Sequence, residues 1–289
     1  MAAATPVAVA PSKRTTQSSY EKGTTMSTQH EVDVIVARTG AILRVTFNRP
    51  GSLNAFTVPM LNTAVEAVES GAGDPSVRAI VLTGSGRAFS AGADLAGSAE
   101  PGEREATGAA MIDAANRLTM AVRQVPKPVI AAVNGPAVGV GCSFAIAADV
   151  TVAKESAYFL LAFANAGLMP DGGATALIPA AIGRARALRM ALLAERIPAP
   201  LAAEWGLIAA AYPDADFEAE ADRLAHRLAV GPTVAYAHTK HAVNAASLAS
   251  LPEALGTERA GQSELFHSAD FAEGVAAFQE KRTPRFSGQ

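Results

Sequence analysis

The chain has 289 residues, of which 18% are charged and 49% hydrophobic, and its net charge is -3. This composition is typical of a globular protein with a large core, and it excludes the basic field with which many proteins recruit nucleic acid. A single cysteine excludes an intrachain disulfide framework and favours a reducing compartment, so we expect a cytoplasmic location. No apolar run in the sequence reaches the roughly 18 residues that a membrane span requires.

The first 30 residues differ in character from the rest of the chain. A short apolar stretch over residues 2–10 is interrupted by Pro6, and Lys13 and Arg14 follow it instead of preceding it. That order is wrong for a secretory signal. Ser, Thr, Gln and Lys dominate from there to Gln29. We therefore predict a disordered extension over residues 1–30.

Strand and helix patterns alternate after this extension, which favours an α/β fold with much parallel pairing. Apolar runs and polar alternation predict strands over residues 32–36, 41–47, 79–83, 128–133, 149–153 and 158–161. A turn at Arg38–Gly40 joins the first two strands as a hairpin. Thr57 is expected to cap a helix with Pro59 in its first turn. Residues 97–105 are expected to be mobile, and the chain is predicted to be helical from about Gly183.

Helical periodicity predicts further helices over residues 109–124, 142–148, 217–228, 233–249, 252–268 and 269–281. Asp216 is the expected cap of the helix that carries Phe217. The late helices carry apolar stripes, with Leu251, Leu255 and Phe266 as examples, that exceed what one core needs. We expect them to pack on a neighbouring subunit.

Two glycine-containing loops each follow a predicted strand. Ser85–Leu95 follows the first, and Gly139-Val140-Gly141 leads from the second into a helix of small residues. Glycine lets a ligand approach the backbone closely, and a helix start has unpaired amides that favour negative charge. One backbone donor from each loop could hold a developing oxyanion. Taken alone, the second loop is equally compatible with a simple strand-to-helix turn, and neither loop completes a dinucleotide-binding fingerprint.

Several motifs stand in the order found in one known family. They are Asn48-Arg49-Pro50, Leu53-Asn54-Ala55, Ser90–Leu95, Lys127–Gly135, Gly139–Cys142, Gly167–Gly173 and Glu273–Arg282. On these motifs, the chain resembles the enoyl-CoA hydratase/isomerase (crotonase) superfamily over residues 32–286.

The resemblance implies a spiral of ββα units over residues 31–230, followed by a C-terminal helical trimerisation region over residues 231–289. It implies a homotrimer or a dimer of trimers. It also implies an acyl-CoA thioester substrate that carries its own CoA, so that no separate cofactor is needed. The oxyanion donors fall on the amides of Ala93 and Val140. The expected CoA-binding residues are Ser52, Leu53, Ala91, Ala93, Asp94, Leu95, Ala96 and Val140.

The general acid or base is the point at which this chain departs from the family's hydratases. Their two catalytic glutamates align with Ser143 and Phe163, neither of which can do the same work. Asp171 is the remaining acid in this neighbourhood, where several isomerases of the family also carry one. It could be a helix N-cap. It could instead be an acid/base in a cavity walled by Phe159, Leu160 and Phe163, whose apolar surroundings would raise its pKa.

The sequence favours an isomerase that removes a proton next to the thioester, with Asp171 moving the proton to another carbon. A hydratase with non-standard water activation is the alternative within the family. A CoA-thioester-binding protein without catalysis is the alternative of another class. Cys142 lies among small apolar residues and is expected in the core. The five histidines show no metal-ligand spacing, so no metal is expected.

Overall fold

The computed structural model describes residues 32–94 and 101–289. The extension predicted over residues 1–30 therefore lies outside the described residues. The strands are β1 (Val34–Thr39), β2 (Ile42–Phe47), β3 (Ala79–Gly84), β4 (Val129–Val133), β5 (Ala137–Val138), β6 (Val150–Lys154), β7 (Tyr158–Leu160), β8 (Ile197–Pro198) and β9 (Ala210–Tyr212). The α-helices are α1 (Val58–Gly73), α2 (Pro101–Gln124), α3 (Val140–Ala147), α4 (Ala174–Leu193), α5 (Ala199–Trp205), α6 (Phe217–Val230), α7 (Thr233–Ser247), α8 (Leu251–Leu265) and α9 (Ala269–Glu280). Short 3-10 helices cover Pro50–Ser52 (η1) and Ala162–Ala166 (η2).

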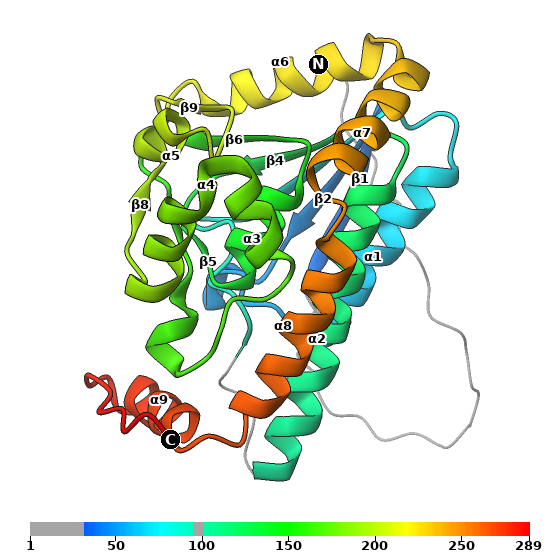
Figure 1. Cartoon of the computed structure of the whole chain (residues 1–289). Coiled ribbons are helices and arrows are strands. Elements are labelled where there is room, and N and C mark those ends of the chain that lie inside the picture. The colour runs from blue at the N-terminus through cyan, green and yellow to red at the C-terminus, as the bar shows by residue number, and fades with distance from the viewer. Residues whose placement is uncertain (1–31, 95–100) are drawn as a thin grey trace, which may run out of the picture.

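The main sheet has six strands in the order β1-β2-β3-β4-β6-β9 (Figure 1). β1 and β2 form the predicted antiparallel hairpin, and every later neighbour pairs in parallel. Parallel strands need a crossover connection, and helices supply it after β2, β3 and β4. A second sheet of three strands, in the order β5-β7-β8, lies beside the first.

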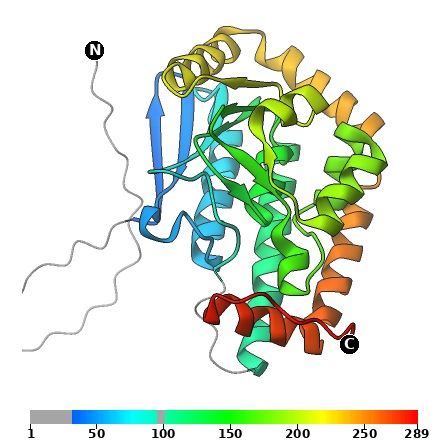
Figure 2. The same cartoon turned by 90° about the vertical axis from the view of Figure 1, so that its left-hand side faces the viewer.

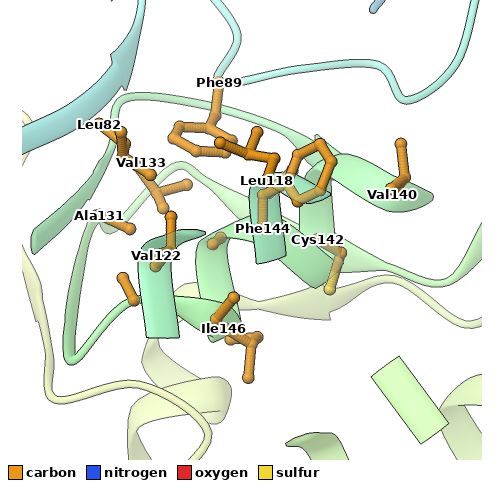
Figure 3. Close-up of a cluster of buried hydrophobic side chains, with 14 of the residues drawn as sticks. Leu82, Phe89, Leu118, Val122, Ala131, Val133, Val140, Cys142, Phe144 and Ile146 are labelled. Atoms are coloured by element: carbon orange, nitrogen blue, oxygen red, sulfur yellow. The ribbon is translucent and has the colours of Figure 1, made fainter. Parts of the chain in front are cut away.

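Alternate residues of the central strands point to opposite faces of the main sheet. On one face, Ile80 and Leu82 of β3 join the large core with α1, α2 and α3. On the other face, Val81 packs against α6 through a smaller cluster that includes Phe217 and Ala221. Figure 3 shows the large core where α3 enters it: Cys142 and Phe144 lie among Leu118, Val122 and Val133. α3 is therefore buried along its whole length, which fixes its N-terminus against the rest of the molecule.

Several features of the structure differ from the prediction. α2 begins at Pro101, so the part of the expected mobile stretch at residues 101–105 is helical. Packing decides this, because α2 runs beside α8 (Figures 1 and 2) and Gly108 faces the ring of Phe266. The stretch after Gly183 also contains β8 and β9, and pairing with β6 draws the alanine-rich Ala210–Tyr212 into the main sheet. Asp216 stands at the N-cap position of α6, but its side chain donates or accepts no capping hydrogen bond.

The late helices pack into the core of this chain to a greater extent than the sequence predicted. Leu251 and Leu255 of α8 are buried against residues of the large core, so our expectation that they face a neighbouring subunit was wrong. α7 is different, since none of its residues is buried and Val234 is 74% exposed. Among the described helices, none combines the length and the apolar character that crossing a membrane demands.

The start of α1 follows the predicted capping chemistry. Thr57 is the N-cap, its hydroxyl accepts a hydrogen bond from the Met60 amide, and Pro59 stands in the first turn. We expect Thr57→Ala to lower the free energy of unfolding by about 1 kcal/mol, because that amide loses its partner. Thr57→Ser keeps the hydroxyl and is expected to stay within a few tenths of the wild type. Urea unfolding followed by circular dichroism measures both, and equal losses in the two variants would contradict the capping role.

Candidate active site

A cavity of about 370 Å³ lies where the loops after β3 and β5 face α2, α8 and α9. The C-terminal helices of the same chain contribute to its wall through Gln262, Phe266 and Phe271. The cavity brings together three residues that the sequence analysis had singled out, Ala93, Val140 and Asp171. They come from three separate loops, at positions 47 and 31 residues apart in the sequence. Most of the remaining wall is apolar, with Met111, Ile112, Phe163, Leu168, Phe266 and Phe271 among its residues.

The two glycine-containing loops touch each other at one edge of this cavity. Gly92 and Gly139 both have positive φ, +96° and +56°. A Cβ placed on Gly139 would lie only 3.7 Å from the Cα of Gly92. The positive φ at each position favours glycine. Because Gly92 and Gly139 lie against each other, the residues that follow them, Ala93 and Val140, lie beside this contact between the two loops.

Several backbone amides around this contact are engaged. Gly92 donates to the Ser90 hydroxyl, Asp94 donates to Phe56, and Gly139 donates to Leu160. For Ala93 and Val140, no acceptor is found within residues 32–94 and 101–289. In the parallel bridge to Phe56 the neighbours of Ala93 make both hydrogen bonds, so the amide of Ala93 itself points away from that segment. Val140 is the first residue of α3, where helix geometry leaves the amide free.

The helix dipole adds to these two donors. α3 begins at Val140, and all eight of its residues are buried. The partial positive charge of a helix N-terminus acts more strongly in a cavity with few water molecules than at a surface. The edge where Ala93 and Val140 meet is thus suited to a negatively charged oxygen.

Asp171 lies on a loop that packs directly against the first turn of α3. A Cβ placed on Gly172 would lie 3.0 Å from the Val140 side chain, and the Ser143 hydroxyl donates to the Asp171 carbonyl at 2.7 Å. Gln262 of α8 donates to Oδ2 of Asp171 at 3.0 Å. The other carboxylate oxygen, Oδ1, is buried and has no hydrogen-bond partner among the described residues. A buried oxygen in this state is available to a group that a ligand brings.

The N-cap interpretation of Asp171 was wrong. α4 begins at Ala174 with Gly173 as its N-cap, and the Asp171 side chain accepts no amide hydrogen bond from it. Glu258 of α8 takes that place, since its carboxylate accepts from the amides of Gly173 and Thr175, each at 2.8 Å. The side chain of Asp171 therefore makes no capping hydrogen bond at the start of α4.

The electrostatic setting leaves both protonation states of Asp171 populated near neutral pH. Burial and, second, the nearby carboxylate of Glu258 raise the pKa of Asp171 from 3.8 to about 7, against the lowering effect of the Gln262 hydrogen bond. Burial also raises the pKa of Glu258, although its hydrogen bonds from Thr175 and Gly173 oppose that rise. A carboxyl group with a pKa near 7 can both accept and release a proton at physiological pH.

The positions where hydratase glutamates were sought hold no acid. The Ser143 hydroxyl is used in the contact with the Asp171 backbone, and the Phe163 ring forms part of the cavity wall. Our expectation for the neighbouring wall was partly wrong. Phe159 is fully buried in the core and Leu160 is not among the lining residues, because both belong to β7 of the second sheet. α8 and α9 provide the aromatic wall instead, through Phe266 and Phe271, whose ring centroids are 5.2 Å apart.

The residues expected to hold CoA divide into three groups. Ala91, Ala93, Asp94 and Val140 line the cavity, and Asp94 pairs with Arg49 at 2.9 Å. Ser52 and Leu53 lie outside its wall, although the Leu53 carbonyl accepts from the Ala91 amide and so joins their segment to the loop. Leu95 and Ala96 lie outside the described residues.

Two other expectations from the sequence concern Cys142 and metal ions. Cys142 is fully buried, and burial raises the pKa of its thiol to about 12, which confirms a core residue and leaves no thiolate. In the described part of the chain, no group of three or more His, Cys, Asp and Glu side chains could hold a metal ion.

Glu258 and Gln262, two α8 residues beside the loop of Asp171, were not predicted from the sequence. A signal for them existed. Leu251, Leu255, Glu258 and Gln262 follow helical spacing and share the buried face of α8. Polar residues on an otherwise apolar face mark a site where buried hydrogen bonds are needed.

Comparisons with known proteins agree with this geometry. Residues 37–289 match the family described as enoyl-CoA hydratase/isomerase. A probable enoyl-CoA hydratase of Rhodobacter capsulatus is 46% identical over 245 residues, which cover 85% of this chain and 94% of the relative. The 1,2-epoxyphenylacetyl-CoA isomerase of Escherichia coli is 39% identical over 250 residues, covering 86% and 95%.

A solved structure supports the same assignment. The crystal structure of an enoyl-CoA hydratase from Mycobacterium avium subsp. paratuberculosis superposes with a TM-score of 0.83 at 48% identity, and covers 89% of this chain and 99% of the other. The two sheets and the C-terminal helices are those of the crotonase fold. The chain belongs to the enoyl-CoA hydratase/isomerase family, the crotonase superfamily of acyl-CoA enzymes.

Proposed function

We propose that this enzyme is an isomerase that moves a carbon–carbon double bond in an acyl-CoA thioester, from the 3-position to the 2-position. Asp171 is the acid/base, and the amides of Ala93 and Val140 hold the thioester oxygen. The observation that carries the proposal is the state of the Asp171 carboxylate. It lines the cavity, and its Oδ1 is buried without a partner among the described residues, while Ser143 and Phe163 stand at the two positions where the family's hydratases carry glutamates.

The reaction follows from this placement. The Asp171 carboxylate takes a proton from C2, and the electron pair of that C–H bond moves toward the thioester carbonyl, whose oxygen becomes negative. The amides of Ala93 and Val140 stabilise this oxygen, and the remaining double bond at C3 makes the intermediate a dienolate. Asp171 then returns the proton at C4. The electron pair of the dienolate forms the new bond, the carbonyl is restored, and the double bond stands between C2 and C3.

The pKa of Asp171 suits both halves of this cycle. With a pKa near 7, a substantial fraction is ionised and can accept the C2 proton, and the protonated form is acidic enough to return it. The apolar wall limits water, which would otherwise compete for the intermediate. The CoA part of the substrate is proposed to lie along Ser52, Leu53 and residues 91–96.

Hydration remains the second candidate, because the 46% identical relative is a probable enoyl-CoA hydratase. A hydratase must position a water molecule and take its proton, and in the family two glutamates share this work. Here Asp171 would have to do so without a carboxylate at either of those two positions, which hold Ser143 and Phe163. A thioester-binding protein without catalysis is less well supported, since burying an unpaired carboxylate oxygen costs stability that simple binding does not require.

The deciding experiment follows two reactions and one exchange. The wild-type enzyme is assayed for isomerisation of a 3-enoyl-CoA, for hydration of a 2-enoyl-CoA, and for exchange of the C2 proton in D₂O. We expect fast isomerisation and exchange, with hydration slower by a wide margin. Fast hydration without isomerisation would establish the hydratase, and binding without exchange would establish the non-catalytic protein.

The pH dependence gives an independent expectation. The base is active only when ionised, so kcat/KM for isomerisation should fall below a pH near 7 and level off above it. An enzyme that depends on an ordinary carboxylate would lose activity only near pH 4. A pH profile of kcat/KM between pH 5 and 9 makes the distinction, and a flat profile down to pH 5 would contradict the role of Asp171.

We further propose a homotrimer or a dimer of trimers in the cytoplasm. α7 supports self-association, because its residues are all at least partly exposed and Val234 and Val243 are more than half exposed. The single buried thiol of Cys142 is in keeping with a reducing compartment.

A further inference from the structure

The carboxylate of Asp171 is hydrogen-bonded from one face of a single helix, α8. Glu258 and Gln262 stand four residues apart on α8, so their side chains lie one above the other on the same face. Glu258 is fully buried, and Gln262 is 1% exposed. Buried polar groups are mostly hydrogen-bonded, and the partners of these two side chains lie in the loop that carries Asp171 and at the start of α4.

Gln262 determines how the carboxylate of Asp171 is oriented. Its amide nitrogen donates to the Met169 carbonyl at 2.7 Å and to Oδ2 of Asp171 at 3.0 Å. Both N–H groups of the side chain are used in this way, one on the loop backbone and one on the carboxylate. The hydrogen bond fixes Oδ2 and leaves Oδ1 as the free oxygen, the one without a partner among the described residues.

Glu258 acts on Asp171 through charge instead of contact. Its two oxygens accept from the amides of Gly173 and Thr175 and from the Thr175 hydroxyl, which anchors it at the N-terminus of α4. Amide donors and the positive end of a helix both favour an ionised carboxylate and oppose the effect of burial, which raises the pKa of Glu258. Asp171 lies two residues before Gly173, so a negative Glu258 disfavours a second negative charge beside it.

We propose that Glu258 and Gln262 are positioning residues for Asp171: Gln262 binds Oδ2 and so selects Oδ1 as the oxygen that carries the proton, and Glu258, held by the amides of Gly173 and Thr175, places a second buried carboxylate behind the loop of Asp171. This rests on the proposed function of Asp171 and extends it to α8. α8 thereby takes part in the site in addition to contributing to the wall of the cavity.

The other charged groups around Asp171 do not compete with this pair. The η2 segment and α3 carry no charged residue, and the first turn of α4 carries no acid. Several described charges on the surrounding helices are engaged with other groups: Asp113 with Arg259, Arg117 with Asn62, Arg123 with Asp149, Asp270 with the amides of Ser287 and Gly288, and Glu273 with Arg282. Asp94, which lines the same cavity, is paired with Arg49.

The test compares the acid limb of the kcat/KM profile in three variants of the full-length enzyme. Glu258→Gln removes the negative charge, so the pKa of Asp171 should fall and the limb should move to lower pH by roughly one unit. Gln262→Met keeps the size but removes the hydrogen bond to the ionised form, so the limb should move to higher pH. Glu253→Gln is the matched control, because it makes the same charge change on an exposed part of α8. Its limb should stay in place.

Gln262→Met gives a second readout, since a wrongly turned carboxylate slows the chemical step. We expect kcat to fall by roughly 10-fold to 100-fold with KM nearly unchanged. A role for Gln262 in packing alone predicts lower thermal stability with an unmoved limb and an unmoved kcat.

Opposite movements of the limb in Glu258→Gln and Gln262→Met support the proposal. Limbs that coincide with the wild type in both variants overturn it. If Glu258→Gln does not fold, Gln262→Met decides alone: a limb moved to higher pH supports the proposal, and a limb that coincides with the wild type overturns it. Failure of the proposed function is recognised separately, because Asp171→Asn would then retain its isomerase rate or the wild type would lack a limb near pH 7.

Discussion

Asp171→Asn is expected to lower the isomerase turnover by roughly 10²–10⁴-fold while the affinity for acyl-CoA thioesters survives. The substitution keeps the shape of the side chain, and the new amide oxygen can accept the hydrogen bond that Gln262 now donates to Oδ2. The amide has no proton to exchange at neutral pH. Steady-state rates with a 3-enoyl-CoA, together with thioester binding by calorimetry, measure the two effects separately.

Stability provides the control for this variant. The pKa of Asp171 is raised in the folded enzyme, so its stabilising contribution is present below pH 4, the ordinary range of the unfolded group, and is lost as pH rises through about 7. At pH 8 the wild type therefore carries the cost of a buried charge that Asp171→Asn lacks. The melting temperature of the variant at pH 8 should equal or exceed that of the wild type. A large drop in melting temperature would show that Asp171 holds the fold together.

Val140→Pro is expected to lower kcat/KM by roughly 10²–10³-fold, which corresponds to about 2.7–4 kcal/mol in the barrier. It removes the amide proposed to hold the thioester oxygen. The first position of a helix is the one place where proline is well tolerated, because the helix does not use that amide. Val140 occupies this position in α3, so the helix should persist.

Val140→Ala is the matched control, since it trims the same buried side chain but keeps the amide. We expect it to lose some stability and little activity. Comparison of kcat/KM at matched folded fractions, measured by near-ultraviolet circular dichroism, separates the two effects. Equal activity in Val140→Pro and Val140→Ala would place the oxyanion site elsewhere.

Both predictions concern residues that could be found from sequence, and the reason is local. Val140 follows a glycine at a strand-to-helix junction, and such a junction exposes backbone amides whatever surrounds it. Asp171 follows Pro170 and precedes Gly172-Gly173 before a helix. Those residue types mark loops and helix starts through their backbone preferences. The same local chemistry explains why the hairpin, the Thr57 cap and the late helices agree with prediction.

Errors occurred where a neighbour decides the outcome. The helix start near Asp171 invites the N-cap interpretation, yet Glu258, 87 residues away in the sequence, takes the amides instead. The apolar stripe of α8 predicts a buried face but does not indicate which surface covers it. α2 and α4 of the same chain turned out to cover Leu251 and Leu255.

The sequence by itself determined the alternation of strands and helices, the two glycine-containing loops, the family resemblance and the absence of the paired glutamates at Ser143 and Phe163. These follow from backbone preferences, periodicity and residue identity, which act over a few positions. Only the tertiary structure decided that Ala93, Val140 and Asp171 line one cavity and that Glu258 and Gln262 stand behind the carboxylate. Burial and the charge of Glu258 raise the pKa of Asp171, and both come from side chains that meet only when α8 folds back beside α2 and α4.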